Sequence, residues 1–175
     1  AASQPPGGRR PPQALVLAAA ARLRDDAPQG VANVAWALAR LREADPRILG
    51  EVVAEAHRRL GEFDPQNVSN VAWALATLAA DEPALLAGMA QRAGATLADF
   101  GPQELSNLAW AFASLLCDDP QLFRSIAREA ALKARDLWPQ NLANIPWAFA
   151  KVQADGEELL SALEGEALAK LESFG

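Results

Sequence analysis

One motif occurs four times in this chain, and each copy begins 37 residues after the one before it. Every copy opens with Pro-Gln, places Asn four residues after that Gln, and places Trp-Ala three residues after the Asn. The copies begin at Pro28, Pro65, Pro102 and Pro139. A fixed period without insertions indicates one supersecondary unit stacked in a line, because each unit buries its apolar face against a neighbour that resembles it.

The unit is predicted to be a helical hairpin. Its first helix, which we call helix A, is expected over 28–41, 65–78, 102–115 and 139–152, since Pro suits a first helical position and good helix formers follow. Its second helix, helix B, is expected to start where an acidic residue precedes Pro, at Asp45-Pro46, Glu82-Pro83 and Asp119-Pro120. Gly156-Glu157 takes this place in the fourth unit.

These units predict an all-α fold, a right-handed α-solenoid, over residues 12–175. The four repeats are 28–64, 65–101, 102–138 and 139–175, and residues 12–27 are interpreted as helix B of a preceding repeat because Leu23 is in phase with Leu60 and Leu97. Residues 1–11 are interpreted as a disordered linker or the cut edge of a longer chain. The chain therefore reads as a segment of a longer array, for which at least one exposed apolar end is expected.

Helix A has two unlike faces when it is drawn at 100° per residue. In the first unit the face with Val31, Val34, Leu38 and Leu41 should meet the B helices, and alanines flank it where neighbouring A helices pack. The opposite face carries Gln29, Asn33, Trp36 and Arg40. A helices should therefore line the inner side of two helical layers.

Two kinds of position follow on this inner face. The repeat framework is the same in all units: Gln29, Asn33 and Trp36; Gln66, Asn70 and Trp73; Gln103, Asn107 and Trp110; Gln140, Asn144 and Trp147. The variable positions change from unit to unit: Gly30 and Arg40; Asn67 and Thr77; Glu104 and Ser114; Asn141 and Lys151. A constant framework with a few changing polar positions is typical of a modular reader of single strands.

The framework residues are interpreted first as structural. A Trp kept in every unit most often packs between neighbours, with base stacking as the alternative. A kept Asn most often bonds the backbone of the adjacent unit, forming a ladder, with ligand contact as the alternative. Trp138, which stands where Asp64 and Gly101 precede Pro-Gln, is interpreted as a loop-packing residue, with a contact role as the alternative. Pro146, inside the fourth helix A, is expected to bend it.

The composition argues against a membrane protein, a metalloprotein and an enzyme. The longest fully apolar run, 14–21, is far shorter than the roughly 20 residues of a membrane span. Cys117 and His57 are each the only residue of their kind, so no metal site, cofactor site or catalytic constellation is expected, and the chain is not expected to be an enzyme. The net charge of −6 opposes phosphate binding, although the A helices carry Arg40 and Lys151 against Glu104 alone.

The motif PQ-x-[VL]-[AS]-N-x-x-W-A-[LF]-A-x-[LV] resembles the octotricopeptide and heptatricopeptide repeats. It is more loosely similar to the leucine-rich region of FAST-kinase-like proteins and to RNA-editing substrate-binding complex proteins. The resemblance covers residues 13–175. It implies an α-solenoid that binds single-stranded RNA in the mitochondrial matrix, or alternatively in the chloroplast stroma, together with other proteins of a ribonucleoprotein complex. It also implies a role in RNA processing, stability, editing or translation.

A protein-binding scaffold is the alternative function. Helical-repeat modules of this general kind can hold a peptide in the same groove. Neither a membrane nor a metal is expected as a partner under either hypothesis.

Overall fold

The computed structural model describes residue 23 and residues 27–42 and 45–172. Every regular element within them is helical. The A helices are α2 (Pro28–Leu41), α4 (Pro65–Thr77), α6 (Pro102–Ser114) and α8 (Pro139–Val152). The B helices are α3 (Pro46–Arg58), α5 (Pro83–Thr96), α7 (Pro120–Leu132) and α9 (Glu157–Glu172). Short 3-10 helices η1 (Leu60–Glu62), η2 (Leu97–Asp99) and η3 (Ala134–Asp136) follow the first three B helices.

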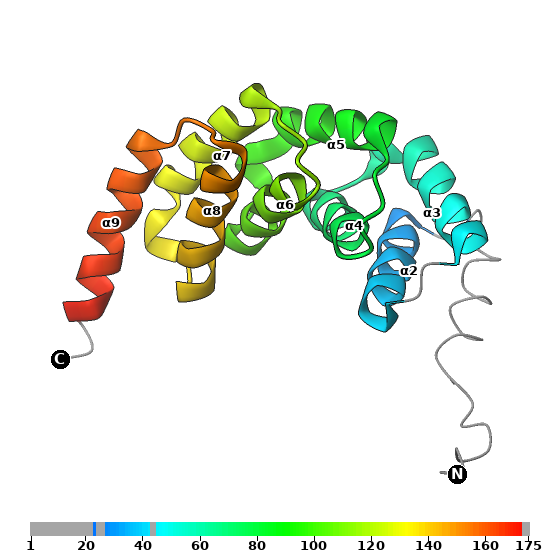
Figure 1. Cartoon of the computed structure of the whole chain (residues 1–175), viewed down its shortest axis with the longest axis horizontal. Helices are drawn as coiled ribbons and strands as arrows, with labels where there is room; N and C mark the ends of the chain where they lie inside the picture. Colours follow the sequence, from blue (N-terminus) through cyan, green and yellow to red (C-terminus); the bar gives the residue numbers. More distant parts are fainter. Residues whose placement is uncertain (1–22, 24–26, 43–44, 173–175) are drawn as a thin grey trace, which may run out of the picture.

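The helices form an arc of two rows (Figure 1). Along the inner side α2, α4, α6 and α8 pack in succession, and along the outer side α3, α5, α7 and α9 do the same. The all-α prediction is confirmed, and every predicted helix A and helix B begins at its predicted residue. Residues 1–11, and 12–27 except Leu23 and Ala27, lie outside the described residues.

The helix starts follow from local chemistry. Each A helix and the first three B helices have Pro in their first turn, where a backbone N–H would have no intrahelical partner. Carboxylates cap three of these starts: Asp45 accepts from the Arg47 N–H, Asp64 from the Asn67 N–H, and Asp119 from the Gln121 and Leu122 N–H groups.

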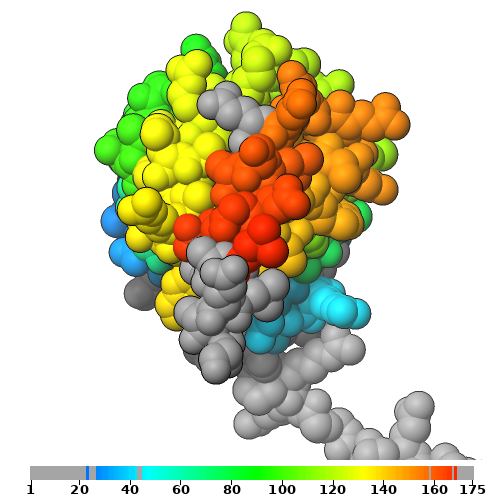
Figure 2. Space-filling view, turned by 90° about the vertical axis from the view of Figure 1, so that its left-hand side faces the viewer, coloured from blue at the N-terminus to red at the C-terminus, as the bar shows by residue number. Residues whose placement is uncertain are grey.

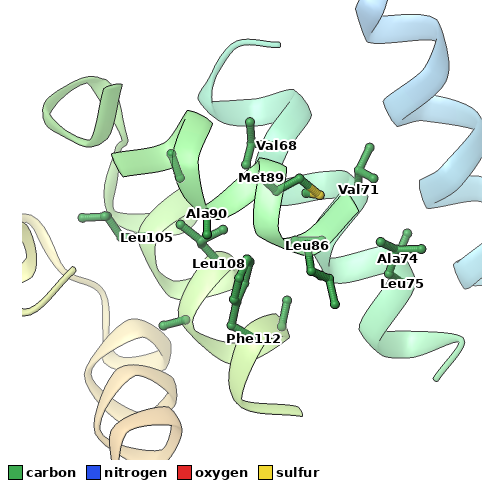
Figure 3. Close-up of a cluster of buried hydrophobic side chains, with 14 of the residues drawn as sticks. Val68, Val71, Ala74, Leu75, Leu86, Met89, Ala90, Leu105, Leu108 and Phe112 are labelled. Atoms are coloured by element: carbon green, nitrogen blue, oxygen red, sulfur yellow. The ribbon is translucent and has the colours of Figure 1, made fainter. Parts of the chain in front are cut away.

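The core lies between the two rows. Close to its centre, Val68, Val71 and Leu75 of α4 meet Leu86 and Met89 of α5, with side chains of α6 beside them (Figure 3). After each 3-10 helix one large apolar residue is fully buried, at Phe63, Phe100 and Leu137. The apolar face predicted for helix A therefore forms one side of the core, except that Leu41, in the last turn of α2, is exposed.

Alanines allow the A helices to lie close together. Ala35, Ala72 and Ala109 occupy one register position and are all buried. Pro146 takes this position in α8, which continues through it without interruption. The proline therefore does not end the helix, and the bend stays a prediction.

The C-terminal end of the described arc exposes apolar side chains, as expected. Leu160 of α9 is exposed, whereas its register equivalents Leu86 and Phe123 are buried. On α8, Ala150 is exposed, whereas its equivalent Ala113 is buried. Figure 2 looks onto this end, where α9 lies across the centre of the surface.

Each A helix is followed by a residue in the left-handed backbone region. The four residues, Arg42, Ala79, Leu116 and Gln153, are 37 positions apart and have φ between 51° and 56°. In three units the next N–H reaches back to the last turn, from Ala80 to the Leu75 carbonyl, from Cys117 to Phe112 and from Ala154 to Phe149. This is the Schellman arrangement, built here without the glycine that usually serves it.

Glycine at such a position is therefore expected to stabilise the fold. We expect Ala79→Gly to raise the free energy of unfolding by roughly 0.5 to 1 kcal/mol, because it removes the cost of a Cβ at positive φ. Ala87→Gly, at an exposed site inside α5, should instead lower it by about 1 kcal/mol. Urea unfolding of both variants tests the pair, and a loss for Ala79→Gly would contradict the backbone argument.

Cationic side chains of the B-helix row donate hydrogen bonds to backbone carbonyls of the preceding unit, at or beside the ends of the 3-10 helices. Arg92 Nε donates to the Phe63 carbonyl at 2.9 Å, and Lys133 Nζ donates to the Ala98 and Phe100 carbonyls at 2.7 and 2.8 Å. Lys133 also pairs with Glu129 at 3.3 Å. Phe63 and Phe100 occupy equivalent positions in consecutive units. A cation therefore bonds the chain at the same place in both units, although Arg92 and Lys133 come from different turns of their helices.

Loss of the hydrogen bonds from Lys133 is expected to destabilise the junction between consecutive units. We expect Lys133→Met to lower the free energy of unfolding by roughly 1.5 to 3 kcal/mol, since hydrogen bonds to a charged donor are lost. Lys151→Met, at an exposed lysine on α8, is the matched control and should be neutral. If chemical denaturation gave the same loss of stability for both variants, the Lys133 hydrogen bonds would not stabilise the junction.

Candidate nucleic-acid interface

Four parallel stripes of side chains cover the inner row of helices. Each A helix presents Gln, Asn, Trp and one variable residue at intervals of four, three and four residues, which places them on one helical face. None of these sixteen side chains is buried in the described structure. The helices α2, α4, α6 and α8 pack side by side along the inner side of the arc (Figure 1). Their buried faces meet the B helices, so the stripes on the opposite faces lie next to one another on the inner surface. We call this surface the inner face.

The Trp residues both pack and reach solvent. Trp73 and Trp110, which have a neighbouring A helix on each side, are half-buried against the core. Trp36 and Trp147, at the two ends of the row, are 46% and 45% exposed. Packing between neighbouring helices therefore buries part of each indole ring, and the exposed part of the ring faces the concave side of the arc.

The predicted Asn ladder is absent, which corrects the sequence interpretation. Across the described residues, the Asn33, Asn70 and Asn144 side chains make no hydrogen bond to protein. Asn107 is bonded only to its own unit, accepting from Gln103 Nε2 at 2.8 Å. Most amide groups of the inner face are therefore available to a ligand.

The four residues in the last turn of the A helices differ in charge. The Arg40 guanidinium lies over the Trp36 ring, 5.6 Å from its centroid, and Lys151 is exposed on α8. Between them Ser114 carries a half-buried hydroxyl group, and the Thr77 hydroxyl oxygen is buried without a hydrogen-bond partner. A cation and an exposed indole thus stand at each end of the inner face.

The second variable column does not belong to this surface. Asn67 and Asn141 are buried, which contradicts their predicted exposure as recognition residues. Asn141 Oδ1 accepts from the Trp138 N–H and caps α8, because the helix start has orphan N–H groups. Glu104 lies beside Gly101 at the start of α6, and Gly30 is half-buried at the start of α2. The Asn141 side chain thus serves a helix start, a role that a helical-wheel argument does not detect.

Trp138 also departs from its prediction. It is 75% exposed, so it does not pack in a loop. Its register equivalents are Ala27, Asp64 and Gly101, all of them helix N-cap residues. The exposure of Trp138 favours the alternative interpretation, a contact role, since an exposed large aromatic side chain is common at binding sites.

The loops from helix A to helix B are acidic. Burial raises the pKa of the Cys117 thiol, and the charges of Asp119, Asp81 and Asp118 raise it further. The thiol therefore stays protonated near neutral pH and is a poor nucleophile. No cluster of His, Cys, Asp or Glu within the described residues could hold a metal ion, and no helix there is long and apolar enough to cross a membrane.

The fold and the inner face define an all-helical, repeat-built protein whose concave side is lined by amide and indole side chains. A model of the RNA-editing substrate-binding complex 6 protein family matches residues 27–174, and the chain belongs to that family. The match covers all the described helices. Comparison with individual curated proteins gives no match.

Proposed function

We propose that the chain is a non-catalytic module that binds single-stranded RNA along its inner face within an organellar RNA-editing complex. The observation that carries the proposal is the row of amide side chains that are kept in every unit and yet bond no neighbouring unit. The family, named for an RNA-editing substrate-binding complex, supports RNA and protein as partners. The mitochondrial matrix is the proposed location, with the chloroplast stroma as the alternative.

The proposed architecture is a right-handed α-solenoid of 37-residue hairpins of the octotricopeptide type. The recurring helix starts, 3-10 helices and left-handed C-terminal residues support it. In such a solenoid each unit meets only its neighbours, so the binding surface grows by one stripe per unit. A strand that crosses the A helices would meet one stripe per nucleotide.

The residues of a stripe suit different parts of a nucleotide. Amides can bond base edges, the exposed part of an indole can stack on a base, and Arg40 and Lys151 can pair with phosphate. The proposed path runs over exposed groups of all four A helices and needs no displacement of the core.

Salt dependence tests this proposal. With two phosphate contacts, from Arg40 and Lys151, the affinity for a random single-stranded RNA pool should fall with a log–log salt slope of about −1.4. Replacing both residues by Ala should remove most of that slope and weaken binding, with little change in melting temperature, because neither side chain is buried.

Arg47→Ala, at an exposed arginine on α3, is the matched control and should leave slope and affinity unchanged. Filter binding at several salt concentrations gives the slopes. An unchanged slope in the Arg40→Ala, Lys151→Ala variant would refute the proposed inner-face path.

A protein scaffold is the second candidate function. It is favoured by Trp138 and Leu132, which are 75% and 74% exposed outside the inner face, at the junction that follows α7. Large exposed apolar side chains of this kind are typical of protein contacts. Failure of a random RNA pool to bind at either low or moderate salt would favour this function over RNA binding.

A further inference from the structure

The Gln, Asn and Trp residues of the inner face are identical in all four units. A residue that is the same in all units is ordinarily structural, because it cannot distinguish one unit's ligand from the next. Asn33, Asn70 and Asn144 have no protein hydrogen bond, and Asn107 bonds only Gln103 of its own helix. Their identity is therefore not explained by the junctions between units.

Each unit offers the same hydrogen-bonding pair. Gln and Asn stand four residues apart on each A helix, so their amides are neighbours on the helix surface. In α6, where Gln103 Nε2 donates to Asn107 Oδ1, the Gln103 oxygen and the Asn107 nitrogen are still available. Every unit thus presents at least one donor and one acceptor, and paired donors and acceptors are what an amide uses to read a base edge.

Three residues of the variable column have one property in common. Arg40, Ser114 and Lys151 differ in size and charge, but all three carry hydrogen-bond donors, whereas the Thr77 hydroxyl in the same column is buried. Residues of all three types contact phosphate and sugar oxygens, which are the same for every nucleotide. A column that tolerates exchange among them suits the invariant backbone of a strand better than its varying bases.

We propose that the Gln-Asn pairs read the bases, that Arg40, Ser114 and Lys151 of the variable column hold the sugar-phosphate backbone, and that the ligand is an RNA tract of one repeated base. Four identical readers in a row select the same base four times. Such a tract also binds in every register, which raises its apparent affinity over that of a mixed sequence. This inference rests on the proposed RNA-binding function.

The test compares unstructured homopolymers of A, C and U with a mixed sequence, all of about 12 nucleotides, for the unaltered chain. One homopolymer is expected to bind roughly tenfold or more tightly than the mixed sequence. Equal affinity for the mixed sequence and for all three homopolymers would overturn the inference while leaving RNA binding intact. No binding to any of them would overturn the proposed function as well.

Two variants separate the roles of the columns. Gln66→Ala with Asn70→Ala should weaken the favoured homopolymer by about tenfold and change the mixed sequence little, since it removes one reader. Arg40→Ala should weaken both RNAs by the same factor. The opposite pattern, with Arg40→Ala changing base preference and the amide variant weakening both RNAs equally, would overturn the assignment. Thermal melting verifies that each variant is folded.

Discussion

The Ala113→Asp variant is expected to lose about 3 to 5 kcal/mol of folding free energy, the largest effect we predict. Ala113 is fully buried on α6 within the row of A helices. A carboxylate there would lose its hydration, which is costly for a charged group. Since each unit is held by its neighbours, the C-terminal hairpin should unfold separately from the rest, at lower denaturant concentration.

Ala150→Asp is the matched control. Ala150 has the same register position on α8 and carries the same residue, but it is exposed. The substitution should therefore cost less than about 1 kcal/mol, mainly through helix propensity. Denaturant unfolding followed by circular dichroism compares the two variants. A loss of similar size in both would contradict the packing of the inner row.

Trp73→Ala is expected to lower stability by roughly 2 to 3 kcal/mol, somewhat less than a fully buried Trp would lose. Trp73 is half-buried between α2 and α6 and packs against the core. Trp36→Ala is the comparison, because Trp36 is 46% exposed at the end of the row. It should lose about 1 kcal/mol, part of which reflects its contact with Arg40.

Thermal and urea unfolding measure both losses. Equal, small losses would mean that the Trp column does not pack between helices, and its conservation from unit to unit would then have to come from ligand contact alone.

The sequence contains strong signals for the helix starts. Proline restricts the first turn, and Asp45 and Asp119 add side-chain caps, so local chemistry decides where a helix begins. The period then places like helices side by side without any long-range information. For these reasons the two rows and the buried stripes could be predicted.

Other features depend on tertiary contacts that no local pattern encodes. The helices end at left-handed Arg42, Ala79, Leu116 and Gln153, where no glycine marks the stop. Lys133 donates hydrogen bonds to the carbonyls of Ala98 and Phe100, more than 30 residues earlier in the chain.

The candidate site was predicted in part. Its framework and its last-turn column lie on the inner face, as the helical angles indicate. Asn67 and Asn141 do not: both are buried in a first helical turn, and the Asn141 side chain accepts a hydrogen bond from the Trp138 N–H there. The Asn ladder was expected from identity between units, and the structure instead leaves most of these amides facing solvent.

The central claim is that RNA lies along the inner face, and ultraviolet cross-linking to a random single-stranded RNA pool tests it most directly. Mass spectrometry of the cross-linked peptides should place the RNA on α2, α4, α6 and α8, close to Trp36, Trp73, Trp110 and Trp147. Cross-links confined to the outer helices α3, α5 and α7, or to the edge around Trp138, would contradict it.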